Sequence, residues 1–120
     1  MPFNYILTNL LVDVPQAVGA IFLDHEGETI ECVTREGDPY GLKVEGAYHS
    51  IFKRRIGQAL DEISVGPVES YIIASDALTS LTQVLQDGYY VVLVIRRDGL
   101  TARANYHLRR AAQIIARELA

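Results

Sequence analysis

The chain has a single cysteine, Cys32, and no apolar run long enough to cross a membrane. One cysteine cannot form an internal disulfide, which excludes a disulfide-stapled scaffold and favours a reducing cytoplasm. The apolar run Tyr89–Ile95 has seven residues, whereas a membrane-spanning helix needs roughly 20. The chain opens without basic residues, so we expect no secretory signal. These absences predict a cytoplasmic protein that does not insert into membranes.

Motifs of catalysis and cofactor binding are also missing. Gly41–Gly46 has the glycine spacing of a phosphate loop, but Ala47-Tyr48 follows it where that loop needs Lys and Ser or Thr. Neither G-x-G-x-x-G nor G-x-S-x-G occurs. The three histidines share no metal-ligand spacing, and Ser50 follows His49 directly on a predicted helix, where neighbours do not face each other. We therefore expect no enzyme activity, no cofactor and no metal.

Charge is divided unevenly along the chain. Residues 1–91 carry five Lys and Arg against thirteen Asp and Glu, a net charge of −8, whereas residues 92–120 carry six Arg against two acids, a net charge of +4. An acidic body argues against broad nucleic-acid binding. Arg103, Arg110 and Arg117 recur every seven residues on the last predicted helix, with only Tyr106 available there for base stacking. This stripe is either a solvated helix face or a surface for an acidic partner.

Tyr89–Ile95 is the segment around which the other elements are arranged. Its residues are β-branched or aromatic apart from Leu93, and Asp-Gly pairs bound it on both sides. Alternate residues of a strand point to opposite faces, and both faces here are apolar. The segment therefore predicts the central strand of a sheet covered by helices on both sides.

The remaining segments predict an α/β (α+β) protein with the order α-β-β-α-β-β-β-α. Short turns join several strands, so much of the sheet is expected to be antiparallel. In the second strand, Ile30 and Cys32 are expected to point inward and Val33 outward, and its two glutamates suit an exposed sheet edge. The predicted elements before and after Tyr89–Ile95 are helix 3–14, strands 18–23 and 28–34, helix 40–64, strands 68–74 and 78–85, and helix 101–119.

The predicted helix 40–64 carries more apolar surface than one sheet contact requires. One stripe contains Val44, Ala47, Tyr48 and Ile51, and a second contains Phe52, Ile56, Ala59, Leu60 and Ile63. A helix on a sheet needs one apolar face. Two stripes indicate one surface against the sheet and one against another molecule; a single broad core stripe is the alternative. Gly46 costs about 1 kcal/mol relative to Ala inside a helix, which indicates close approach of another element.

A turn near the first hairpin holds several potential metal ligands. Asp24, Glu26 and Glu28 surround a tight turn with His25, but the spacing is not that of a twelve-residue calcium loop. A solvated turn accounts for these residues.

Several segments in a fixed order resemble the roadblock / dynein light-chain family, in the form seen in bacteria. The resemblance covers essentially residues 1–120, expected to form a single roadblock-like domain. The segments that carry it are Leu10–Val12, Val14–Ala20, Asp24–Glu28, Val44–Tyr48 and Leu85–Leu93.

The resemblance implies a three-layer fold and a dimer. The family sheet has five strands, with one helix on one face and two on the other. Its members form homodimers or heterodimers through the long second helix and the edge strand after it, which gives a continuous sheet across the pair. Carried over to this chain, the interface would contain Val44, Ala47, Tyr48, Ile51, Phe52, Arg55, Tyr71 and Ile73.

The resemblance also implies a function without chemistry. Family members regulate or scaffold Ras-like small GTPases or link dynein complexes, and bacterial relatives include dimeric GTPase-activating partners of the polarity GTPase in gliding bacteria. We therefore expect a homodimeric regulator or adaptor of a small GTPase. Two alternatives stay open: a sensory domain for a small ligand, and a purely structural dimerisation module.

Overall fold

The computed structural model describes residues 2–120, and within them it has the predicted order of helices and strands. A short 3-10 turn, Gln86–Gly88, precedes the last strand. The elements are α1 (Pro2–Asp13), β1 (Ala17–Leu23), β2 (Thr29–Thr34), α2 (Tyr40–Glu62), β3 (Ser70–Ala74), β4 (Leu78–Val84), β5 (Tyr90–Arg96) and α3 (Thr101–Leu119).

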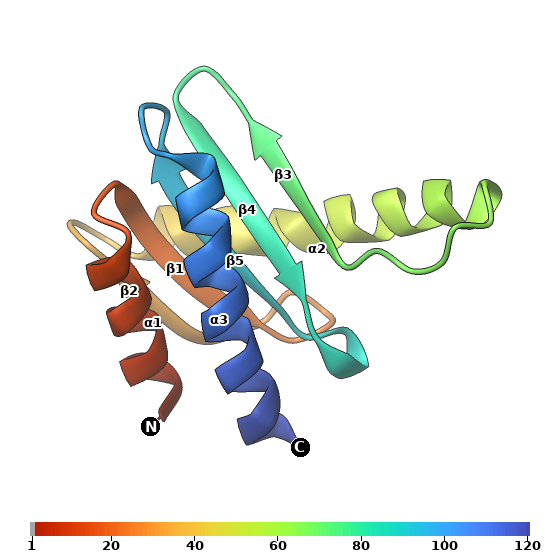
Figure 1. The fold of residues 1–120 in the computed structure, drawn as a ribbon, viewed down its shortest axis with the longest axis horizontal. Helices are drawn as coiled ribbons and strands as arrows, with labels where there is room; N and C mark the ends of the chain where they lie inside the picture. Colours follow the sequence, from red (N-terminus) through yellow and green to blue (C-terminus); the bar gives the residue numbers. More distant parts are fainter. Residues whose placement is uncertain (1) are drawn as a thin grey trace.

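The five strands form one sheet in the order β2-β1-β5-β4-β3 (Figure 1). Each neighbouring pair is antiparallel, as the short turns predicted. The central position of β5 is confirmed: it pairs with β1 through Ile21 and Val92, and with β4 through Leu81 and Leu93. β2 and β3 are the two edges, and the edge position predicted for β2 is confirmed.

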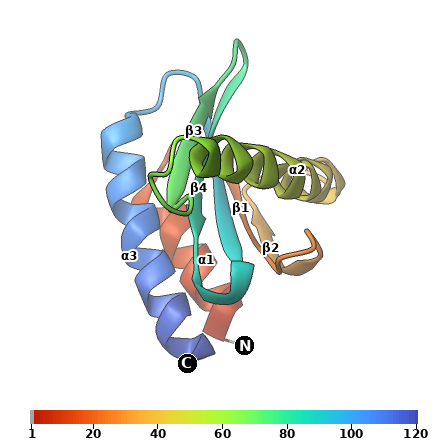
Figure 2. The same ribbon diagram turned by 90° about the vertical axis from the view of Figure 1, so that its right-hand side faces the viewer.

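β5 is buried on both faces, as its apolar pattern predicted. Val91, Leu93 and Ile95 belong to the core beneath α1 and α3, and Val92 and Val94 belong to the core beneath α2. The sheet therefore lies between two helical layers, with α1 and α3 on one face and α2 on the other (Figure 2). This arrangement confirms the three-layer architecture.

The side-chain alternation predicted for β2 is wrong at two positions. Val33, expected outward, packs against the core that contains α1 residues, and Ile30, expected inward, is 40% exposed. A register shift causes the second error, because Phe22 pairs with Glu31 but Leu23 pairs with Thr29, which leaves Ile30 unpaired in a bulge. Val33 is covered because α1 lies partly over β2.

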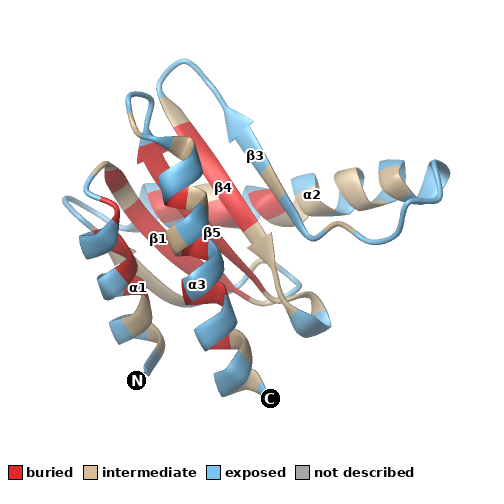
Figure 3. Cartoon of the chain, viewed as in Figure 1, coloured by how far each residue is buried: buried red, intermediate tan, exposed pale blue. Residues whose placement is uncertain are grey.

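Burial differs strongly across the sheet. Strands β1, β5 and β4 are largely buried, whereas β3 and the second half of α2 are largely exposed (Figure 3). In Figure 1, α2 crosses the sheet with its first half and then runs on beyond the β3 edge. None of the helices in residues 2–120 is long and apolar enough to span a bilayer.

Candidate interaction surfaces

Helix α2 contacts the sheet through a narrow face with three buried residues. Its buried residues are Leu42, Gly46 and His49, which belong to neither of the two apolar stripes predicted for this helix. The expectation that one stripe lies against the sheet is therefore wrong for this protomer. The contact is narrow because α2 crosses the sheet with only its first half.

Gly46 allows this close crossing, as predicted. A Cβ atom at Gly46 would lie 3.0 Å from Ile21 Cδ1 and 3.0 Å from Leu23 Cδ2. The Tyr90 hydroxyl, which reaches up from β5, donates a hydrogen bond to the Gly46 carbonyl oxygen at 2.9 Å. The helix backbone is thus held directly on the sheet at this point.

His49 forms a buried polar cluster with Tyr71 of β3 and Thr82 of β4. His49 Nδ1 lies 2.8 Å from the Tyr71 hydroxyl and 3.3 Å from Thr82 Oγ1, and Tyr71 donates to the His49 carbonyl oxygen at 3.3 Å. The histidine side chain is 1% exposed, and burial raises the pKa of Tyr71 to about 12. This His49 cluster joins α2 to the edge of the sheet.

Lys53 continues the same helical face and makes a further polar contact. Its Nζ donates to the Gly88 carbonyl oxygen at 2.7 Å and lies 4.6 Å from the centre of the Tyr90 ring. Burial lowers the pKa of this lysine. The contact residues of α2 recur at 42, 46, 49 and 53, a 4-3-4 helical spacing that is visible in the sequence. The hydropathy pattern does not mark this face because only Leu42 in it is apolar.

The predicted interface residues of α2 lie on its solvent-facing side. Tyr48 is 56% exposed and Phe52 36%, and their rings stack with centroids 6.5 Å apart. Val44, Ala47 and Arg55 are also exposed, and Ile51 is half-buried. The structure therefore leaves these side chains without an intramolecular core to fill.

The two predicted interface residues of β3 differ in burial. Tyr71 is half-buried in the His49 cluster, whereas Ile73 is exposed. Ile72, on the opposite face of the strand, is 47% exposed and was not among the predicted interface residues. Within residues 2–120, β3 is hydrogen-bonded to β4 alone, so its outer edge is open there. We call the eight residues Val44, Ala47, Tyr48, Ile51, Phe52, Arg55, Tyr71 and Ile73 the α2/β3 surface.

The acidic turn at Asp24 is closed by its own hydrogen bonds. Asp24 Oδ1 accepts from the backbone N–H groups of Glu26 at 2.9 Å and Glu28 at 3.0 Å. Across residues 2–120, no group of three or more His, Cys, Asp or Glu side chains is arranged to hold a metal ion. The carboxylate of Asp24 thus has a structural role in the hairpin.

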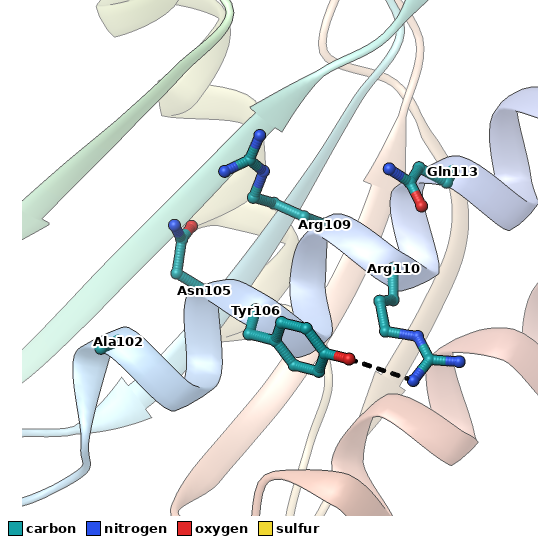
Figure 4. A pocket seen from close by; sticks show the side chains of 6 residues that line it. All are labelled: Ala102, Asn105, Tyr106, Arg109, Arg110 and Gln113. Carbon is teal, nitrogen blue, oxygen red and sulfur yellow. Dashed lines mark hydrogen bonds between the residues drawn. The ribbon is translucent and has the colours of Figure 1, made fainter.

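Helix α3 presents its arginines to solvent, as predicted. Arg110 lies over the Tyr106 ring, with its guanidinium carbon 5.8 Å from the ring centre, and Nη1 donates to the Tyr106 hydroxyl at 3.4 Å. Figure 4 shows Arg110 directed toward α1 and Arg109 directed the other way, over the sheet. Both flank shallow hollows on the outside of the helix. The buried face of α3 is the predicted one: Ala104, Leu108, Ala111, Ala112 and Ile115.

Solved structures identify the fold, although no protein-family model and no curated protein matches the chain. Myxococcus xanthus MglB superposes with a TM-score of 0.89 at 9% identity, over 99% of this chain and 95% of that chain. The Roadblock/LC7 domain from Streptomyces avermitilis has a TM-score of 0.87 at 16% identity, over 97% and 96%. MglC from Myxococcus xanthus has a TM-score of 0.73 at 22% identity, over 98% and 99%. The chain therefore has the Roadblock/LC7 fold.

Proposed function

We propose that residues 1–120 form one roadblock-like domain that pairs through the α2/β3 surface and serves in the cytoplasm as a non-catalytic regulator or adaptor of a Ras-like small GTPase. The observation that carries this proposal is the open β3 edge beside an exposed apolar helix face. Apolar side chains gather on this surface, and those of Val44, Tyr48, Phe52 and Ile73 are exposed in the single chain. Exposed apolar patches of this kind mark interaction sites.

A second copy of the chain fits both parts of this surface. An open strand edge presents unpaired N–H and C=O groups, and a β3 strand from another protomer would satisfy them and extend the sheet. The α2 helix of the second copy would then lie beside α2 of the first, where it would bury the exposed rings of Tyr48 and Phe52. To be stable, this helix pair and strand pair would need to bury about 1,200–2,000 Å² of surface in total.

The fold is the reason for proposing a small GTPase as the partner. MglB from Myxococcus xanthus and the gliding protein MglB from Thermus thermophilus share this architecture over nearly the whole chain. The family that the sequence resembles regulates or scaffolds Ras-like small GTPases. The absence of any predicted catalytic motif fits a role in which the partner performs the chemistry. The dimer supplies a rigid surface that selects one nucleotide state of the GTPase.

Two variants test the dimer. We expect Ile51→Asp and Tyr48→Asp each to weaken self-association at least 100-fold, because each would bury an unpaired carboxylate at the interface. Light scattering after size exclusion, over a range of protein concentrations, measures the mass. Lys43→Glu, a charge change at an exposed α2 position outside the α2/β3 surface, is the control. An unchanged dimer in both aspartate variants would show that this surface is not the interface.

An affinity experiment tests the GTPase. The dimer, immobilised, is incubated with native extract in the presence of a GTP analogue, GDP or no nucleotide, and the retained proteins are identified by mass spectrometry. We expect enrichment of one small GTPase in a single nucleotide condition, with loss of that enrichment for the monomeric variant. An intact dimer that retains no GTP-binding protein in any condition would favour the structural dimerisation module.

A further inference from the structure

A groove runs between α1 and α3, on the side of the sheet opposite the α2/β3 surface. Its volume is about 380 Å³. The apolar lining comes from Ile6, Leu10 and Val12 of α1 and from Ala111 and Ile114 of α3. The two helices lie side by side and antiparallel in Figures 1 and 2, and the residues that line the groove fall within 6–13 of α1 and 107–114 of α3.

Two apolar side chains of this groove are more exposed than the core requires. Val12 is 70% exposed and Ile114 40%, and they stand on opposite walls. Leu10 and Ala111 below them are buried and form the floor. A groove with an apolar floor and exposed apolar walls is the shape that receives one further amphipathic helix.

The rim of the groove is cationic. Arg110 lines it, and Arg103 and Arg117 lie one heptad away in each direction along α3. Among the residues that the structure describes, no α3 arginine has a carboxylate within 4.0 Å. The one acidic side chain that lines the groove, Asp13, lies 3.8 Å from His107 and is directed to that neighbour. The contact with Tyr106 already orients Arg110, which lowers the entropic cost of binding an anion there.

We propose that this groove binds an amphipathic α-helix of a partner protein whose apolar stripe is flanked by acidic residues. The heptad spacing of the arginines is the reason for proposing a helical partner. Arg103 to Arg117 covers about 21 Å at 1.5 Å per residue, so a helix lying alongside presents carboxylates at i, i+7 and i+14 in the same register. Charge complementarity selects an acidic occupant, since Arg110 lines the groove and Arg103 and Arg117 lie one heptad to either side of it on α3, without carboxylate partners among the described residues.

The groove proposal is independent of the dimer and of the GTPase. The α2/β3 surface lies on the other side of the sheet, so a variant of the groove leaves self-association unchanged. A membrane surface is the competing occupant for a cationic helix face. We favour a partner helix over a membrane because the groove has a buried apolar floor, Leu10 and Ala111, between its two walls, and a flat bilayer surface would not fill it.

Two designed peptides test the proposal. Both have 18 residues with the same leucine stripe; one carries Glu at the flanking positions and the other carries Lys. Fluorescence anisotropy of the labelled peptides, titrated with the dimer at low salt, is expected to show micromolar binding of the Glu peptide and at least tenfold weaker binding of the Lys peptide. Equal binding of the two peptides would overturn the proposal.

Protein variants locate the site. The double variant Arg103→Glu with Arg110→Glu should lower the affinity for the Glu peptide at least tenfold and raise the affinity for the Lys peptide. Lys43→Glu with Arg54→Glu, an equal charge change on α2, should alter neither. Val12→Asp and Ile114→Asp should each lower the affinity for the Glu peptide. Because Val12 is the more exposed of the two, Val12→Asp should keep the fold even if Ile114→Asp does not. Unchanged binding in the arginine and Val12 variants would overturn the site.

Vesicles test the competing occupant. Sedimentation with phosphatidylserine-containing and pure phosphatidylcholine vesicles is expected to retain little protein in either case. Strong, arginine-dependent binding to the anionic vesicles, without preference for the Glu peptide, would assign the face to a membrane surface instead. The mass of the dimer, measured on every variant, separates failure of this proposal from failure of the proposed dimer.

Discussion

The two faces of the sheet are held in different ways. Beneath α1 and α3, fifteen buried apolar residues form one cluster, while beneath α2 the corresponding cluster contains six. On the α2 side, polar contacts hold the helix. They are the His49 cluster and the hydrogen bonds from the Tyr90 hydroxyl to the Gly46 carbonyl oxygen and from Lys53 to the Gly88 carbonyl oxygen. A helix fixed by a few directional contacts keeps its apolar residues free for another molecule. The first face therefore holds most of the buried apolar surface, and the second leaves apolar side chains of α2 exposed.

The largest expected effect lies in the core beneath α1 and α3. Phe22 is fully buried, with its ring centroid 5.0 Å from that of Phe3 and 5.8 Å from that of Tyr89. Phe22→Ala should lower the free energy of unfolding by about 3–5 kcal/mol, because the cavity is enclosed on all sides. Leu42→Ala, on the α2 side, should cost about 2 kcal/mol, at the lower limit for such truncations. Urea denaturation at equilibrium measures both, and equal losses would contradict the proposed difference between the faces.

The His49 cluster gives the next largest effect. His49→Ala should lower the free energy of unfolding by about 2 kcal/mol, because it leaves a cavity and removes the partner of the Tyr71 and Thr82 hydroxyls. The variant should also loosen β3, which raises amide hydrogen exchange in Ser70–Ala74 more than in β5. His25→Ala, at an exposed histidine in the first hairpin, is the control and should cost less than about 0.5 kcal/mol. Uniform exchange changes across the sheet would contradict a local role for His49.

The contrast between the faces also explains which parts of the structure follow from the sequence. β5 could be predicted because apolar residues fill both of its faces, and the buried face of α3 because its alanines and leucines keep helical spacing. On α2, the close approach at Gly46 could be predicted from the cost of glycine in a helix, but the contacts of His49 and Lys53 could not, since neither residue is apolar and no hydropathy pattern marks them. Ile30 was misplaced because a bulge interrupts the alternation of β2.

Part of the candidate interface could also be predicted from the residues themselves, and part only from the family resemblance. The exposed side chains of α2, such as Tyr48 and Phe52, could be chosen from the sequence because the helix carries more apolar surface than one sheet contact can bury. That β3 is the free edge came from the family resemblance, since strand order is a property of the whole sheet. The assignment of all eight residues to a dimer interface stays a prediction, which the aspartate variants test.

The smallest expected effect is a pH dependence that originates at the α2 side of the sheet. Burial raises the pKa of Tyr71 to about 12, and burial also raises the pKa of Tyr90. A tyrosine in the unfolded chain ionises near pH 10, so between about pH 10 and 12 the unfolded state releases protons that the folded state keeps. The free energy of unfolding should therefore be unaffected by these groups below about pH 9 and should fall as the pH rises through that range.

Urea denaturation at pH 8, 10 and 11.5 should show a shallower fall for Tyr71→Phe than for the parent protein, together with a loss of about 1 kcal/mol at pH 8 from the missing hydroxyl contacts. Tyr5→Phe, which removes a hydroxyl from an exposed ring of α1, should leave stability at pH 8 unchanged. An alkaline fall of the same steepness in Tyr71→Phe and the parent would show that the hydroxyl of Tyr71 does not contribute to it, and would leave Tyr90 on Gly46 as the contact that responds to pH.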